Sequence, residues 1–264
     1  MLGPLLFILF FNAIIKGMTA VEVALYADDI AAWTASKNID ELSKKLQEFL
    51  NHIEGWLAQY RVKLNVSKTV YTVFSRRREP VQLSLLFSGA ALGHTTTPKF
   101  LGITLDTQFT FKHYVSDLVA RCEKRLSMLR SLSGRTWGMS EKLLLATFRS
   151  LIRSLIDYAP IIIINLPKSS LEKLELIQRK ASRIITRSHP RAPTAELFER
   201  LRLTTIETRA AELSIAYWDK ALIENVLIQE LYGAYRPHAA AREGVERASQ
   251  RTTIIGRILE LKGQ

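Results

Sequence analysis

The chain is poor in the residues that cross-link small proteins or bind zinc. Its 264 residues include one cysteine, Cys122, and five scattered histidines. A single cysteine excludes an intrachain disulfide and favours a reducing compartment. The histidines have no neighbouring cysteines, so the sequence does not offer the Cys and His ligands of a structural zinc site. Internal repeats and low-complexity runs are also absent, which excludes a repeat architecture.

Long apolar runs are missing as well. The most apolar stretch, residues 5–15, is much shorter than the about 20 residues that a membrane-spanning helix needs. No basic residues precede it and no small-residue cleavage site follows it, so it does not resemble a signal peptide. We therefore predict a buried helix here, with no membrane among the partners. If this helix were exposed, its apolar surface would favour aggregation.

Acidic residues are few relative to basic ones. The chain has 37 Lys and Arg against 25 Asp and Glu, a net charge of +12 with a pI near 9.9. This imbalance indicates a polyanionic partner, either nucleic acid or an anionic membrane surface. The hydrophobic fraction of 47% is ordinary for a globular protein and suffices for a core.

Two adjacent carboxylates are the most informative feature that is present. Asp28 and Asp29 follow Tyr26 and Ala27 and separate two runs of apolar residues. Such runs on both sides of a short polar pair predict a β-hairpin with the carboxylates at its tip. Neighbouring carboxylates repel unless a cation lies between them, and carboxylate oxygens are ligands for Mg²⁺. The turn therefore predicts a Mg²⁺ site, with Mn²⁺ as the alternative. An ordinary exposed acidic turn is the competing interpretation.

The rest of the first hundred residues alternates helix and strand. Asn38 and Glu41 have the spacing of a capping box. The apolar positions that follow have helical spacing and predict a core-facing helix: Leu42, Leu46, Phe49, Leu50, Ile53, Trp56 and Leu57. Strands are expected at residues 62–65, 70–75, 82–87 and 99–105, with a break at residues 76–80. This pattern predicts an α+β fold in which an antiparallel sheet carries helices on one face.

From about residue 111 the pattern is helical. Three apolar stripes predict three helices joined by breaks near residues 133–134 and 160–167, which is typical of a bundle. The stripes are Val115, Leu118, Val119, Cys122, Leu126 and Leu129; Leu144, Phe148, Leu151, Ile152 and Leu155; and Leu171, Leu174, Ile177, Ala181, Ile184 and Ile185. Residues 207–232 are helical by composition, and the basic tail after Arg236 is expected to be loosely held.

The helical part carries most of the positive charge. Residues 112–200 contain 17 Lys and Arg against 8 Asp and Glu, a net charge of +9. Seven basic residues at helical spacing are candidates for binding a phosphate backbone: Arg121, Lys124, Arg125, Lys173, Lys180, Arg183 and Arg187. Basic residues in register can follow a phosphate backbone without reading bases. The alternative interpretation is a solvated helix face.

Four motifs in the same order resemble the reverse transcriptase family, most closely its non-LTR (LINE-like) retrotransposon branch. Residues 26–29 resemble the YxDD box in the polymerase palm. Residues 3–12 resemble the end of the motif that faces template and nucleotide. Residues 64–69 resemble the segment whose lysine follows the YxDD box, and residues 100–106 resemble the primer-grip hairpin. Beyond residue 106 the similarity continues, more weakly, as a helical thumb.

The resemblance assigns roles to particular residues. Asp28 and Asp29 would be catalytic residues that bind the metals, and Lys68 would protonate the departing pyrophosphate. Lys68 is equally compatible with a plain surface lysine. A primer-binding segment would comprise Lys99, Phe100, Leu101 and Gly102. Tyr26 would pack beneath the turn and position it. The partners implied are an RNA template, a DNA primer and, in the complete enzyme, a dNTP.

The resemblance also defines what this sequence does not contain. The family's fingers and a third catalytic aspartate would precede Gly3, so the chain looks like the C-terminal half of a polymerase. We expect a partial palm at residues 1–106, a thumb-like bundle at 107–204, and a C-terminal helix with a basic tail at 205–264. The predicted parent activity is RNA-directed DNA synthesis by two-metal nucleotidyl transfer, inside the cell, in nucleus or cytoplasm. The alternatives are an inactive remnant that binds nucleic acid and, less favoured, a membrane-surface protein.

Overall fold

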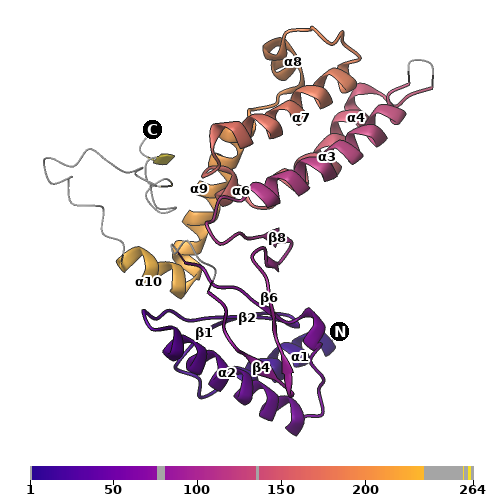
Figure 1. The fold of residues 1–264 in the computed structure, drawn as a ribbon. Coiled ribbons are helices and arrows are strands. Elements are labelled where there is room, and N and C mark those ends of the chain that lie inside the picture. Colours follow the sequence, from indigo (N-terminus) through magenta and orange to yellow (C-terminus); the bar gives the residue numbers. More distant parts are fainter. Residues whose placement is uncertain (1, 76–80, 135–136, 235–257, 259–260, 263–264) are drawn as a thin grey trace, which may run out of the picture. The chain divides into compact units, whose positions relative to one another are not determined.

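The structure is a computed structural model that describes residues 2–75, 81–134, 137–234, 258 and 261–262 (Figure 1). The chain forms two compact units, Met1–Thr110 and Phe111–Gln264. The first mixes helices with small sheets and the second is helical, which agrees with the predicted α+β class. The second unit contains residues 111–204 together with residues 205–264, and in it helix α9 (Ile206–Glu224) packs on α6 (Pro160–Ile163) and α7 (Lys168–Thr186).

The first unit begins with helix α1 (Gly3–Phe11) and a 3-10 turn (Asn12–Ile15). A hairpin of β1 (Glu22–Tyr26) and β2 (Asp29–Trp33) follows, then α2 (Ile39–Gln59) and a second 3-10 turn (Val66–Lys68). The remaining strands have two residues each: β3 (Val70–Tyr71), β4 (Leu86–Phe87), β5 (Ala90–Ala91), β6 (Gly93–His94), β7 (Lys99–Phe100) and β8 (Ile103–Thr104).

The predicted continuous antiparallel sheet is not formed by the described residues. They form four two-stranded sheets, of which β3–β6 is parallel. Two side chains form hydrogen bonds with backbone groups that would pair with a neighbouring strand in a longer ladder. The Tyr71 hydroxyl accepts from the Leu83 N–H at 3.0 Å and donates to the Leu83 carbonyl at 2.7 Å. The Gln47 amide likewise donates to the Leu86 carbonyl and accepts from its N–H. The predicted strands therefore shorten to two residues.

The predicted strand at residues 62–65 is wrong. The Val62 N–H closes the end of α2 by donating to the Leu57 carbonyl at 2.9 Å, and residues 62–65 have no ladder partner among the described residues. The expected break at residues 76–80 and the tail after Arg236, up to residue 257, lie outside the described residues.

Helix α2 agrees closely with its sequence pattern. The Asn38 side chain caps it by accepting from the Asp40 N–H at 2.9 Å. Glu41 reaches back to the Ser36 hydroxyl at 2.7 Å. The predicted stripe forms the core: Phe49, Leu50, Ile53, Trp56 and Leu57 are buried, while Leu42 and Leu46 are partly buried against them. This core also includes Ile14, whose carbonyl contacts the His52 Nε2 atom at 3.0 Å.

Helix α1 forms as predicted, but the prediction that it is buried is wrong. Leu5 is 60% exposed and Leu9 is 69% exposed. The Phe10 ring lies 4.9 Å from the Trp56 ring, and Phe11 is buried. The helix is apolar on all sides, and a helix of this kind needs neighbours all round to be buried. Within its unit α2 covers one side, so the other side stays exposed.

The second unit consists of helices. They are α3 (Lys112–Leu132), α4 (Glu141–Phe148), a π-helical turn (Arg149–Arg153), α5 (Ser154–Ile156), α6, α7, α8 (Thr194–Leu201), α9 and α10 (Val226–Ala234). The predicted stripes on α3 and α7 are buried or half-buried throughout. The expected helix at residues 207–232 divides at Asn225 into α9 and α10. In the part of the chain that the structure describes, no helix has the length and apolarity to cross a membrane.

Beyond Phe148 the predicted stripe of the second helix is wrong at Leu151, whereas Ile152 is buried as predicted. Leu151 is 41% exposed and Leu155 is half-buried, while Ile152, Arg153 and Ile156 are buried. The π-turn causes this shift, because a wider turn rotates every following side chain relative to α-helical spacing. The same rotation moves Arg153 into the interior.

Candidate metal turn and nucleic-acid surface

Asp28 and Asp29 lie at the tip of a two-residue β-hairpin turn, as predicted. The register pairs Tyr26 with Asp29, so Ala27 and Asp28 form the turn itself. Ala27 has φ of 53°, the left-handed conformation that tight hairpin turns require. Both aspartates are exposed. The hairpin thus fixes two adjacent carboxylates on a short, ladder-bonded turn.

Tyr26 does not lie where the sequence suggested. We expected its side chain to pack beneath the turn, but it is 64% exposed. The physical reason is strand alternation, since successive side chains of β1 point to opposite faces. Leu25 instead belongs to the partly buried layer of the core. Tyr26 contributes its backbone to the closing pair of the hairpin, and any further positioning role of its ring stays a prediction.

Asp28 and Asp29 stay candidate metal ligands. Two exposed carboxylates are chemically suited to Mg²⁺ or Mn²⁺, which prefer oxygen ligands. Among the described residues no group of three or more His, Cys, Asp or Glu side chains is gathered as a metal site. Two carboxylates on a solvent-exposed turn can hold a divalent ion weakly, with water completing its coordination.

Lys68 lies at the end of the second 3-10 turn and is exposed. Its N–H donates to the Asn65 carbonyl at 3.1 Å, and the Ser67 hydroxyl donates to the Asn65 side chain at 2.7 Å. Asn65 therefore holds the backbone of this turn while the lysine side chain extends into solvent. The proposed proton-donor role of Lys68 stays a prediction.

The segment predicted to seat a primer is a second tight hairpin. Lys99 pairs with Thr104 and Phe100 pairs with Ile103. The two turn residues both have positive φ, 46° at Leu101 and 79° at Gly102, which matches the type I′ turn favoured in hairpins. Leucine rarely adopts this conformation, so the turn stores some strain. Lys99 and Gly102 are exposed, and the primer-binding role of this hairpin stays a prediction.

The seven basic candidates of the helical unit divide into two groups. Arg121 and Lys124 on α3 and Lys173 on α7 are exposed. They carry no ion pair or side-chain hydrogen bond within the described part of the chain. They stay candidates for binding phosphate.

The other four candidates have partners within the helical unit, and their binding of phosphate stays a prediction. Arg125 donates to the Leu151 carbonyl, and Lys180 pairs with Glu123 at 2.5 Å. Arg183 donates to the Ala192 carbonyl at 3.3 Å and to the Thr194 hydroxyl at 3.4 Å. Arg187 donates to three carbonyls, those of Ser133, Gly134 and Met139. Helix and loop ends leave carbonyls without partners, and arginine side chains satisfy them here.

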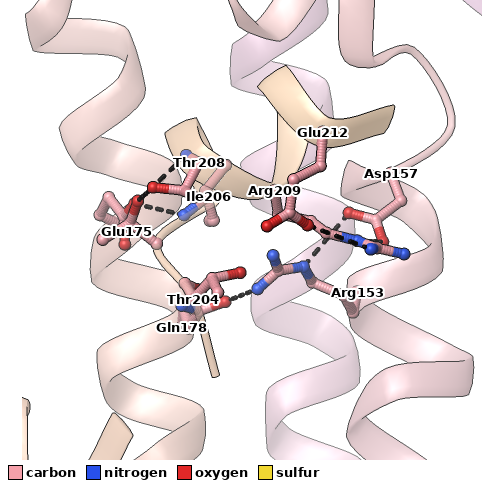
Figure 2. A network of polar contacts seen from close by, with 10 residues as sticks. Arg153, Asp157, Glu175, Gln178, Thr204, Ile206, Thr208, Arg209 and Glu212 are labelled. Atoms are coloured by element: carbon pink, nitrogen blue, oxygen red, sulfur yellow. Dashed lines mark hydrogen bonds and ion pairs between the residues drawn. The ribbon is translucent and has the colours of Figure 1, made fainter. Parts of the chain in front are cut away.

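Sequence patterns missed a buried polar network that joins four helical elements (Figure 2). Arg153, 6% exposed, donates to the Asp157 carboxylate at 3.2 Å and to the Gln178 carbonyl. Gln178 in turn donates to the Thr204 carbonyl at 2.8 Å, and Arg209 of α9 pairs with Asp157 at 3.5 Å. Burial lowers the pKa of Arg153, and the Asp157 charge opposes that shift. The four-residue spacing of Arg153 and Asp157 was the available sequence signal.

A second carboxylate caps α9 from outside. Glu175 of α7 accepts from the Ile206 N–H at 2.5 Å, at the first turn of α9. Burial raises the pKa of Glu175, and hydrogen bonds from the Ile206 and Glu207 N–H groups oppose that rise. This contact and the Arg153 network fix α9 to the bundle.

Comparison with known proteins agrees with the family resemblance of residues 3–106. Residues 1–105 match the family model described as "Reverse transcriptase (RNA-dependent DNA polymerase)". The chain is 29% identical over 199 residues to a "Probable RNA-directed DNA polymerase from transposon BS" of Drosophila melanogaster, covering 75% of this chain and 22% of that protein. It is 26% identical over 259 residues to the "RNA-directed DNA polymerase from mobile element jockey" of Drosophila funebris, covering 95% of this chain and 28% of the relative. The chain thus spans about a quarter of the length of these curated relatives. No solved structure matches it significantly.

Proposed function

We propose that this chain, whose residues 1–105 match the reverse transcriptase family model, is part of an RNA-directed DNA polymerase of a non-LTR retrotransposon. The observation that carries the proposal is the β1–β2 hairpin, which presents Asp28 and Asp29 at a two-residue turn inside the matched region. Unit Met1–Thr110 corresponds in this proposal to part of the palm, and the helical unit to the thumb.

In the proposed reaction, a primer 3′-hydroxyl attacks a dNTP paired to an RNA template, and pyrophosphate leaves. Asp28 and Asp29 would hold divalent ions, which when bound activate the attacking oxygen and stabilise the leaving one. Lys68 would donate a proton to the departing pyrophosphate. The β7–β8 turn, Phe100 to Gly102, would hold the primer end, with the Lys99 ammonium binding its phosphate.

The helical unit would bind the backbone of the primer–template duplex. Arg121, Lys124 and Lys173 are the residues for this role, since their charges are exposed and not neutralised by partners within the described chain. Contacts of this kind position a duplex and carry no sequence preference. They are also strongly dependent on salt, because each phosphate that is neutralised releases counterions.

Duplex binding measured against salt concentration tests this role. We expect the log–log slope for an RNA–DNA duplex to become less steep by about 2 to 3 when Arg121, Lys124 and Lys173 are all changed to Gln, at about 0.9 per phosphate. Asp117→Asn, also on the exposed side of α3, is the matched control that removes a charge of opposite sign. An unchanged slope in the triple variant would remove these residues from the proposed surface.

A second function is favoured by one specific observation. The described residues gather no third carboxylate near the turn, so the chain by itself would be a nucleic-acid-binding module without chemistry. Primer extension with and without Mg²⁺ separates the two functions. Extension that needs Mg²⁺ identifies a polymerase, and binding without extension identifies the module.

A further inference from the structure

The loop between α3 and α4 exposes one of the largest side chains of the molecule. Trp137 is 73% exposed. Burying an aromatic ring of this size is favourable, and exposed large aromatics often mark binding sites. The indole rests on Gly134, where a Cβ atom would lie 2.9 Å from its Cε2 atom. One part of the ring is therefore supported by backbone, and the rest is open to solvent.

The loop is closed tightly beside this ring. The Gly138 N–H donates to the Gly134 carbonyl at 3.0 Å, and the Met139 N–H donates to the Leu132 carbonyl at 2.9 Å. A Cβ atom on Gly138 would lie 2.1 Å from the Gly134 oxygen, so the closure needs glycine at that position. The backbone on the C-terminal side of Trp137 is thus fixed by local contacts.

Arg187 holds the same loop from another helix. Its guanidinium donates to the Ser133 carbonyl at 3.1 Å and to the Met139 carbonyl at 2.7 Å, with a longer contact to Gly134 at 3.4 Å. These contacts bridge both ends of the loop to the end of α7. The fixed backbone on the C-terminal side of Trp137 limits the positions of its ring, which lowers the entropic cost of binding a partner.

The helix ends on both sides of the loop carry positively charged side chains. Arg130 is in the last turn of α3 and Lys142 is in the first turn of α4, and both are exposed. Within the described part of the chain, neither side chain has an ion pair or a hydrogen bond. Glu141, the acidic neighbour, is already engaged by two hydrogen bonds from Arg200, at 3.1 and 2.6 Å. The helix ends on both sides of the loop therefore carry cations that no carboxylate of the described chain neutralises.

We propose that Trp137 is a stacking platform for an unpaired nucleic-acid base, with Arg130 and Lys142 binding the phosphates on either side. The inference rests on the proposed function, which supplies a nucleic-acid partner. An exposed aromatic face next to helix ends that carry cations suits a base with its neighbouring phosphates, and stacking of this kind tolerates any base. An apolar protein partner would not use the two flanking charges.

The test measures binding of a single-stranded DNA of about 12 nucleotides that carries one 2-aminopurine, using the full chain. We expect Trp137→Ala to weaken binding about tenfold and to abolish the quenching of 2-aminopurine, while Trp137→Phe keeps most of both. The salt slope of Trp137→Ala should stay unchanged, whereas Arg130→Gln/Lys142→Gln should make it less steep by about 1.4. Tyr217→Ala, an aromatic residue 50% exposed on α9, is the matched control.

The outcomes separate the two proposals. If the unchanged chain and the Trp137→Ala variant bind equally well, the stacking role alone would be overturned. The indole would then belong to a surface that binds protein. Failure of the unchanged chain to bind either single strands or RNA–DNA duplex would overturn the proposed function together with this inference. Gly138→Ala keeps the tryptophan but displaces the loop that carries it, and this variant should also lose the quenching of 2-aminopurine. The loss in Trp137→Ala would then not result from removing the indole from the fold.

Discussion

The chemistry proposed for the first unit depends on two side chains. Asp28 and Asp29 are exposed on one tight turn, with no third acidic ligand gathered beside them in the described residues. Metal affinity rises with the number of charged ligands, so we predict Mg²⁺ or Mn²⁺ binding in the millimolar range or weaker. Asp28→Asn should abolish binding, because one remaining carboxylate competes poorly with water. Calorimetry or Mn²⁺ paramagnetic resonance measures the change.

The fold should be unaffected by Asp28→Asn. The side chain is exposed at the turn, and such substitutions usually change stability by less than about 0.5 kcal/mol. Asp117→Asn on the helical unit removes an equally exposed carboxylate and should leave metal binding as it was. Tight binding by the unchanged chain would refute the idea that two carboxylates form the whole protein contribution.

Arg153 is the residue on which the interior of the helical unit depends most. Its side chain is 8% exposed and bonded to Asp157 and Gln178. We predict that Arg153→Met lowers the free energy of unfolding by about 2 kcal/mol, since it removes buried hydrogen bonds to Asp157 and Gln178, while Asp157 keeps its longer contact with Arg209. Chemical denaturation followed by circular dichroism measures the change.

Arg149, four residues earlier in the same π-turn, is the control for Arg153. It is exposed and makes one long contact, 3.4 Å, to the Leu201 carbonyl. Arg149→Met should therefore cost less than about 1 kcal/mol. Equal losses for both variants would show that the π-turn, rather than the buried pair, sets the stability of this region.

At the scale of elements, the agreement between sequence and structure depends on local signals. Helix α2 carries a cap at Asn38 and an unbroken apolar stripe, and both are confirmed. The β1–β2 hairpin is confirmed as well, because apolar runs on both sides of the Asp pair fix its register. The π-turn at Arg149–Arg153 has no comparable local signal in the sequence, and it brings Arg153 to partners on other elements.

The basic helix faces show the same limit for the candidate site. Spacing along the sequence predicts that Lys180, Arg183 and Arg187 share one helix face, but α7 ends at Thr186 and spacing cannot show which carbonyls or carboxylates other elements bring to these residues. The partners of Arg187 lie about 50 residues earlier, at Ser133 to Met139. Long-range contacts of this kind give basic residues of a predicted binding face partners within the protein.

The start of α9 depends on a carboxylate from α7, which makes its stability sensitive to pH. Burial raises the pKa of Glu175 from its ordinary value of 4.5. A carboxyl group with a raised pKa binds its proton more tightly in the folded state, so its contribution to stability is greatest below pH 4.5 and is lost as pH rises through the folded value. We predict that, as pH rises through this window, the unchanged chain becomes less stable relative to the Glu175→Gln variant.

Thermal unfolding of both proteins at a series of pH values checks the Glu175 prediction. Glutamine keeps an oxygen that can accept from the Ile206 N–H, so the cap itself is retained. Glu199→Gln on α8, which replaces an exposed carboxyl group, is the matched control for the loss of one acidic side chain. A Glu175→Gln difference that is constant with pH would contradict the assignment.

At the scale of the whole molecule, the question is whether this chain catalyses by itself. It matches about a quarter of the length of its curated relatives, and its described residues gather no three-carboxylate metal site. Two-metal nucleotidyl transfer needs ligands that hold both ions in place. We predict that the 264-residue chain gives no primer extension above background with Mg²⁺ or Mn²⁺ on an RNA template.

A chimaera tests the same prediction by adding a polymerase segment to the chain. Joining the chain to the preceding polymerase segment of a related element should restore extension, because that segment would supply the further ligands and would cover the exposed apolar face of α1. Asp28→Ala should then abolish extension, whereas Asp117→Asn should not. Extension by the 264-residue chain alone, lost on Asp28→Ala, would contradict the prediction. The two aspartates and the substrate phosphates would then suffice to hold the metals.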